Sequence, residues 1–151
     1  RTRSKTKSRE IDLATTELSP EIEAIASQTV DAAMKVHRTL GPGLLEGAYE
    51  ACLEFELRRR SLSVLRQVKP PVTYEGVEIE AGYRLDLLVG GLLIVEVKAA
   101  ESIKNIHRAQ VITYLRLCKL QLGLIINFNS YFLKEGIRRV ILSNHDREHL
   151  D

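Results

Sequence analysis

Three charged side chains, Asp86, Glu96 and Lys98, lie within two short apolar segments of the chain. The segments, residues 84–89 and 92–98, are rich in branched aliphatic residues and flank a pair of glycines, a pattern that predicts two β-strands joined by a turn. A charged group in the middle of such a strand costs desolvation free energy unless it is paired or binds an ion. These three residues are therefore the first candidates for chemistry.

The length of the turn decides whether the two carboxylates meet. Because successive side chains of a strand point to opposite faces, a two-residue glycine turn would place Asp86 and Glu96 on opposite faces of the sheet. A three-residue loop at 89–91 pairs Leu88 with Leu92 and places both carboxylates on one face. Such loops commonly end in a left-handed residue, which glycine supplies. We therefore predict this register or an equivalent bulge.

Two carboxylates on one face repel each other, and a cation between them relieves the repulsion. Oxygen ligands favour a hard divalent ion, Mg²⁺ or Mn²⁺, to which the carbonyl of Val97 would add a further ligand. Lys98, on the face of Glu96, would position an attacking water and stabilise charge on phosphorus. A salt bridge from Lys98 to Glu96 or Asp86 is the alternative, and spacing does not separate the two interpretations.

Helices are expected before and after these strands. Ser19-Pro20-Glu21 is typical of a helix start and Gly41-Pro42-Gly43 of a helix end, so we predict a helix over 20–40. Apolar spacing predicts further helices at 45–60 and 103–117, and strands at 62–68, 72–74, 77–79, 122–128 and 137–142. This succession predicts an α/β domain with a mixed central sheet flanked by helices.

The charge of the chain is unevenly distributed. The net charge of the 151 residues is +2, but the first nine residues carry five basic side chains and no acid, so the remaining 142 have 17 basic and 20 acidic side chains. We predict a flexible basic N-terminal arm over 1–18, a domain over 19–143 and a charged C-terminal tail over 144–151. A nucleic-acid partner therefore cannot be argued from bulk charge.

Other features of composition indicate the compartment. No apolar run approaches the roughly 20 residues needed to span a bilayer, and the basic start is not that of a signal peptide. Cys52 and Cys118 match no metal-ligand spacing and are interpreted as buried thiols in a reducing compartment. We expect a cytoplasmic protein with no membrane partner.

The ordered set of motifs resembles the PD-(D/E)XK nuclease superfamily, which has an aspartate at a strand end followed by a Glu-x-Lys strand. Its restriction-endonuclease-like αβββαβ core matches residues 45–128, with an extra N-terminal helix here. The chain is more closely similar to the bacterial family named for Gly-x-x-Glu-x-x-Tyr, which matches 43–49, and to the RecB-like branch, whose Gln-x-x-x-Tyr signature matches Gln110 and Tyr114. Further matching segments are 83–88, 94–99, 107–110 and 126–128. The similarity covers about residues 20–141.

The resemblance implies a role for each matching position. The implied metal ligands are Glu46, Asp86 and Glu96, to which the strand geometry adds the Val97 carbonyl, and the implied catalytic lysine is Lys98. Gln110 and Tyr114 are implied to orient the site or the nucleic acid, and His107 joins them as a candidate because it lies on the same polar stripe of the helix. The implied activity is hydrolysis of DNA phosphodiester bonds with Mg²⁺ or Mn²⁺. Leu85 stands where the superfamily's proline precedes the aspartate.

Several alternatives stay open. His107, Gln110 and Tyr114 form one polar stripe at helical spacing, but Tyr114 also fits a core tyrosine and His107 a packing residue. Glu46 also fits a residue that stabilises the N-terminus of its helix. The alternative function is a non-catalytic nucleic-acid-binding or assembly module on a nuclease-like fold. DNA is the expected partner; a homodimer, and a larger complex contacted through the basic arm, are left open.

Overall fold

The computed structural model describes residues 18–80 and 82–143, and most of the predicted basic arm and the whole C-terminal tail lie outside these residues. Each helix and strand lies within two residues of its predicted bounds. The elements are α2 (Pro20–Leu40), α3 (Glu46–Arg59), β1 (Val64–Val68), β2 (Val72–Tyr74), β3 (Val77–Ile79), β4 (Leu85–Val89), β5 (Leu93–Lys98), α4 (Asn105–Cys118), β6 (Leu122–Asn127), the 3₁₀ turn η1 (Leu133–Gly136) and β7 (Ile137–Ile141).

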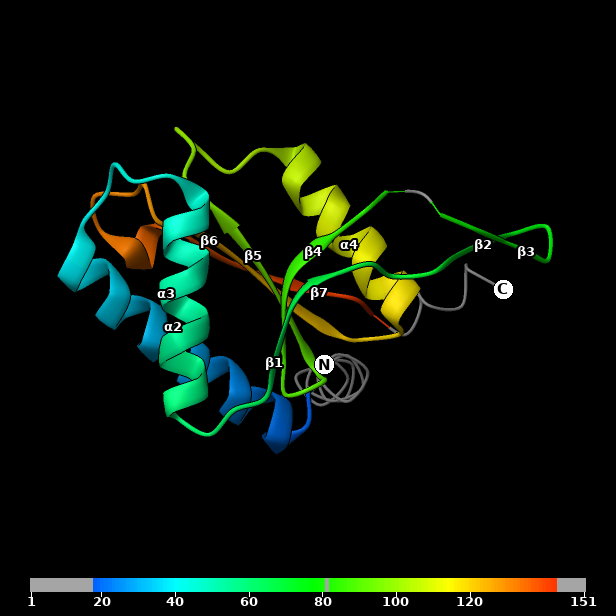
Figure 1. Cartoon of the computed structure of the whole chain (residues 1–151), viewed down its shortest axis with the longest axis horizontal. Coiled ribbons are helices and arrows are strands. Elements are labelled where there is room, and N and C mark those ends of the chain that lie inside the picture. The colour runs from blue at the N-terminus through cyan, green and yellow to red at the C-terminus, as the bar shows by residue number, and fades with distance from the viewer. Residues whose placement is uncertain (1–17, 81, 144–151) are drawn as a thin grey trace, which may run out of the picture.

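A five-stranded mixed sheet forms the centre of the molecule (Figure 1). Its strand order is β1-β4-β5-β6-β7, in which β5 and β6 are parallel and the other neighbours are antiparallel. The parallel pair is joined by α4, because a parallel connection needs a long crossover. The sheet and its flanking helices confirm the predicted α/β, restriction-endonuclease-like class.

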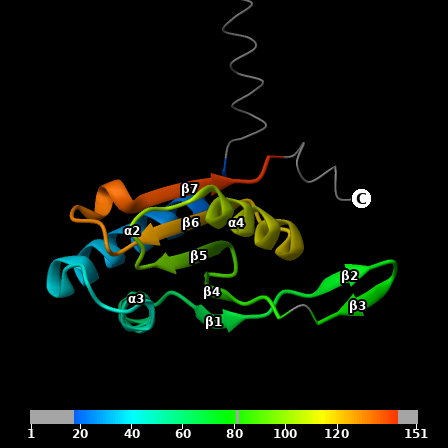
Figure 2. The ribbon, with the colours of Figure 1, turned by 90° about the horizontal axis from the view of Figure 1, so that it is seen from above.

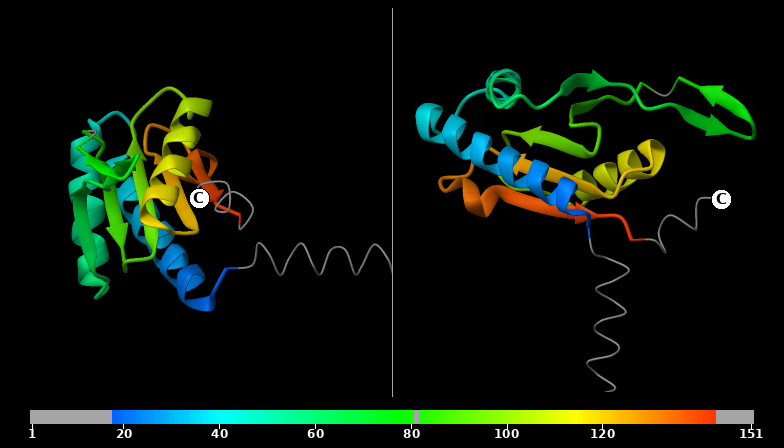
Figure 3. Two further views of the ribbon diagram at one scale, coloured as in Figure 1. Left: turned by 90° about the vertical axis from the view of Figure 1, so that its right-hand side faces the viewer. Right: turned by 90° about the horizontal axis from the view of Figure 1, so that it is seen from below.

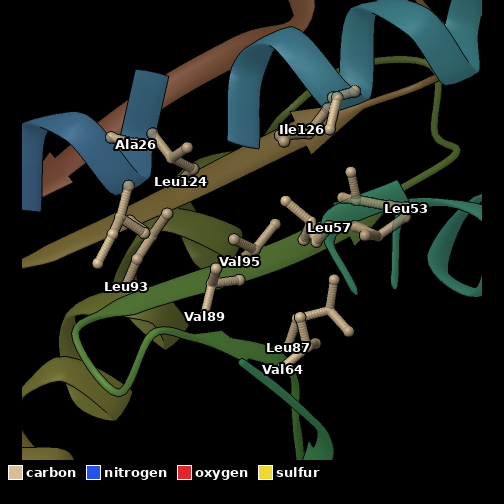
Figure 4. Packing of buried hydrophobic residues seen from close by; sticks show 14 of the residues in the cluster. Ala26, Leu53, Leu57, Val64, Leu87, Val89, Leu93, Val95, Leu124 and Ile126 are labelled. Atoms are coloured by element: carbon tan, nitrogen blue, oxygen red, sulfur yellow. The ribbon is translucent and has the colours of Figure 1, made fainter. Parts of the chain in front are cut away.

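Helices cover both faces of the sheet (Figure 3). On β5 and β6, alternate residues belong to two separate hydrophobic clusters, one with α2 and α3 and the other with α4. Figure 4 shows the first cluster, in which Ala26 of α2 and Leu53 and Leu57 of α3 pack over the central strands. Full burial of a leucine side chain stabilises the fold by roughly 1.5–3 kcal/mol, so these clusters hold the strands and helices in one arrangement.

The loop between α2 and α3 is held by Tyr49. Its hydroxyl donates to the carbonyl oxygen of Gly41 and accepts from the N–H of Leu44 at 3.0 Å, and its buried ring stacks on Phe128 with centroids 4.6 Å apart. Gly43 has a φ of 105°, which only glycine adopts without strain. The glycine–tyrosine segment therefore orients the first turn of α3 relative to the end of the sheet.

The register between β4 and β5 differs from the predicted one by two residues. Val89 pairs with Leu93, and Leu88 pairs with Ile94 rather than with Leu92. The loop has the predicted three residues but consists of Gly90, Gly91 and Leu92, because both glycines have positive φ and form the turn together. A shift of two residues preserves the face of every side chain, so Asp86 and Glu96 still meet.

Along the pair β1 and β4, the side chains change the face of the sheet on which they pack, and the change occurs where Gln67 lies opposite Asp86. Val64 and Leu87 pack with the α2–α3 cluster, whereas Val68 and Leu85, of the same parity, pack with the α4 cluster. The φ of Gln67 is 56°, in the left-handed region, which accounts for the change of face.

The rotated ribbon leads into β2 and β3. They form a separate two-stranded hairpin that projects beyond the body of the molecule (Figure 2). We call this hairpin, residues 72–79, the arm from here on; it is distinct from the basic segment at residues 1–18.

Candidate active site at the fork of two strands

The carboxylates of Asp86 and Glu96 fill a fork where β4 and β5 part. The backbone pairing of the two strands ends at Leu87 and Val95. Beyond it, the N–H of Asp86 donates to Glu96 Oε1 at 2.9 Å, and the N–H of Val97 donates to Asp86 Oδ2 at 2.8 Å. Hydrogen bonds from backbone N–H to a carboxylate are among the stronger ones in proteins. The fork thus fixes both carboxylates side by side.

Both carboxyl groups are held in surroundings that disfavour their charge. Glu96 is only 6% exposed and Asp86 is half-buried. Burial raises the pKa of Asp86 to about 6 and the pKa of Glu96 to about 8, and the charge of Asp86 adds to the shift of Glu96. The Lys98 ammonium opposes both shifts without cancelling them. A cation of higher charge at this point would stabilise both ionised forms.

Three predicted residues lie around the fork. Lys98 is half-buried, two residues after Glu96 on the same face of β5. The buried Tyr114 packs in one cluster with Leu85 and Ile94, next to the two carboxylate strands, and burial raises its pKa, with a further contribution from the charges of Glu96 and Asp86. Burial lowers the pKa of the half-buried His107, followed by the charge of Lys98. Tyr114 of α4 therefore lies near the fork, whereas His107 Nδ1 accepts from the N–H of Lys104 at 3.0 Å and caps the start of its own helix.

Glu50 is a site residue that the sequence analysis missed. It is 5% exposed on α3, and its negative charge contributes to the raised pKa of Asp86, after burial. Gln67 Nε2 donates to both of its carboxylate oxygens at 2.9 Å, and Arg66 forms an ion pair with it. Glu50 precedes the buried Leu53 and Leu57 at helical spacing. An acid in an otherwise apolar stripe is the signal that could have found it.

Two other predicted residues lie at the edge of the site. Glu46, on the first turn of α3, is exposed, and its charge opposes the lowering of the pKa of His107. Gln110 is exposed on α4, between His107 and Tyr114. Their predicted roles in metal binding and in positioning remain predictions.

The residues at the fork suit a divalent cation. Within 18–80 and 82–143, no three His, Cys, Asp or Glu side chains lie close enough together to hold a metal by themselves. Glu50 is already paired with Arg66, so Asp86 and Glu96 are the carboxylates that remain. Mg²⁺ is commonly bound by one or two carboxylates together with waters and substrate phosphate. A two-carboxylate donor set of this kind therefore fits the metal chemistry predicted above.

Comparison with known proteins gives one match. The family model described as the PD-(D/E)XK nuclease superfamily matches residues 23–140, a range that contains every predicted site residue. No curated protein and no solved structure matches the chain. In the part of the chain that the structure describes, no helix is long and apolar enough to cross a bilayer.

Proposed function

The chain belongs to the PD-(D/E)XK nuclease superfamily, and we propose that it is a metal-dependent nuclease that hydrolyses phosphodiester bonds of DNA. The observation that carries the proposal is the convergence of the Asp86 and Glu96 carboxylates at the fork, with Lys98 next on the same face. Nucleases of this superfamily typically use divalent metals. One buried and one half-buried carboxylate with a lysine beside them are the groups that this chemistry requires.

Each residue is assigned one task. Asp86 and Glu96 would hold Mg²⁺ or Mn²⁺, with the Val97 carbonyl and Glu46 as further proposed ligands. When bound, such an ion polarises a phosphoryl oxygen and lowers the pKa of water. Lys98 orients the attacking water and stabilises the negative charge that develops on the phosphoryl oxygens.

The remaining residues of the site would position the substrate or the two carboxylate strands. Tyr114 and His107 on α4 would border the space in which the phosphate lies, and Gln110 would contact the nucleic acid. Glu50, neutralised by Arg66 and held by Gln67, keeps the Asp86 strand at a constant distance from α3. We further assign the chain to the Gly-x-x-Glu-x-x-Tyr family and the RecB-like branch.

The setting of the activity is also proposed. The free thiols of Cys52 and Cys118 suit a reducing, cytoplasmic compartment. The basic residues 1–9 would contribute to contact with DNA or with a partner protein.

The test is cleavage of single- and double-stranded DNA with Mg²⁺ or Mn²⁺. We expect Lys98→Met to lower the cleavage rate by about 10²–10³-fold, the usual effect of removing one electrostatic stabiliser. Asp86→Asn should remove both activity and Mn²⁺ binding. The matched control is Lys134→Met, since Lys134 is an exposed lysine on η1. Equal rates for wild type, Lys98→Met and Asp86→Asn would overturn the proposed mechanism.

A further inference from the structure

A groove lies where the arm meets the body of the molecule. It has a volume of about 480 Å³ and is lined by Lys69, Pro70 and Pro71 on one strand connection and by Glu80 and Tyr83 on the other. Small-molecule sites have volumes of about 300–1,000 Å³, so the groove is large enough for an aromatic ligand. We call it the arm groove.

The arm groove is connected to the fork through two aromatic rings. Tyr83 lines the groove, is 47% exposed and lies three residues before Asp86. Its ring packs edge-on against Tyr114, with centroids 6.2 Å apart. Tyr114 in turn packs in one buried cluster with Leu85, the residue before Asp86, and with Ile94 of β5. A ligand in the groove would therefore occupy the position next to the reacting phosphate.

The charges of the arm restrict what binds there. Glu75, Glu78 and Glu80 are exposed, and the lining contains one basic side chain, Lys69, whose ammonium lies 4.0 Å from Glu80. Phosphates are repelled by such a surface, whereas the exocyclic amines of a base can donate to its carboxylates. Prolines and a tyrosine ring offer flat apolar surfaces on which a base can stack. The lining thus suits a nucleobase rather than a second sugar–phosphate backbone.

We propose that the arm groove holds an unpaired nucleobase that flanks the scissile phosphate, with Tyr83 as the stacking residue. In a duplex this base is already stacked and paired, and the acidic arm repels the second strand. The substrate class is therefore single-stranded DNA or a single-stranded end. This inference rests on the proposed nuclease function and specifies its substrate.

The test measures DNA binding without catalysis. The full chain in EDTA is titrated against a fluorescein-labelled 12-nucleotide single strand and against the blunt duplex of the same sequence. We expect Tyr83→Ala and Tyr83→Leu to weaken single-strand binding about tenfold, within the range for one base–aromatic stack. Tyr83→Phe, which keeps the ring, and the control Tyr74→Ala, at an exposed tyrosine on the arm, should stay within twofold of wild type.

The outcomes separate the two proposals. Unchanged single-strand binding in both Tyr83→Ala and Tyr83→Leu, or an equal loss for the duplex, would overturn the nucleobase site. Cleavage that persists with such a result leaves the nuclease function intact. Binding that depends on Tyr83 without any Mg²⁺- or Mn²⁺-dependent cleavage supports the groove and removes the catalytic proposal. No binding of either DNA in EDTA overturns the nucleobase site, and the cleavage assay with Mg²⁺ or Mn²⁺ then decides the nuclease function.

Discussion

Replacing Glu96 with glutamine removes an ionisable group from the fork between β4 and β5 while it keeps the size of the side chain and its hydrogen-bonding oxygen. In wild type, burial and the charge of Asp86 raise the pKa of Glu96 from 4.5 to about 8. Between these two pH values the folded protein retains a proton that the unfolded chain has released. The free energy of unfolding of the metal-free protein therefore falls as the pH rises from about 5 to 8.

The size of this effect follows from the shift. One pKa unit corresponds to about 1.4 kcal/mol, so the shift of Glu96 sets an upper limit of about 5 kcal/mol. Relaxation of the fork and entry of water reduce this, and we expect roughly 2–3 kcal/mol. Without divalent metal at pH 8, Glu96→Gln should be more stable than wild type by this amount, which raises Tm by about 6–10 °C. At pH 5 the difference should fall to about 1 kcal/mol or less.

Thermal and urea unfolding between pH 5 and 8 in EDTA measure the difference. Glu135→Gln, at an exposed glutamate on η1, is the control and should follow wild type at every pH. Addition of Mn²⁺ at 100 times its Kd should stabilise wild type by about 2.7 kcal/mol and Glu96→Gln by much less. The two proteins would then have nearly equal stability at pH 8, so that most of the advantage of Glu96→Gln is lost when metal is added.

Two results would refute this reasoning. Parallel pH profiles for wild type and Glu96→Gln in EDTA would mean that Glu96 does not carry a disfavoured charge beside Asp86. A wild-type Tm that does not respond to Mn²⁺ or Mg²⁺ at pH 8 would mean that the two carboxylates do not form a cation site. The first result contradicts the geometry of the fork, and the second contradicts the proposed function alone.

Two further substitutions test the scaffold, each measured by urea unfolding. Gln67→Val should destabilise the fold by about 2–4 kcal/mol, because a branched residue is strained at a φ of 56° and both hydrogen bonds to Glu50 are lost. Gln67→Gly also loses the hydrogen bonds but relieves the strain, so it should destabilise the fold by only about 1–2 kcal/mol. A smaller loss for valine than for glycine would contradict this. Gly123→Ala should cost about 1–3 kcal/mol, because the added Cβ would lie 2.5 Å from Cγ1 of the buried Val111; wild-type stability would show that α4 can move away from the sheet.

Much of the fold can be predicted from local patterns. The helix over 20–40 has a serine cap, a proline in its first turn and a glycine at its end, and the structure has these features, with Ser19 Oγ accepting from the N–H of Ile22. The arm follows from Glu75-Gly76 between two short strands. Asp86, Glu96 and Lys98 were found because charged residues in apolar strands are costly. All of these depend on interactions between residues close in the chain.

The arrangement of distant residues could not be predicted in the same way. Two successive glycines permit several hairpin loops, and the packing of Leu87, Val95 and their neighbours against α2 and α3 selects the register with Val89 opposite Leu93. The contact of Glu50 with Asp86 depends on how α3 crosses the sheet. The free energy of such contacts comes from groups far apart in sequence, which periodicity does not relate. Residue types thus indicate which chemistry is available, and packing in three dimensions establishes which residues meet to perform it.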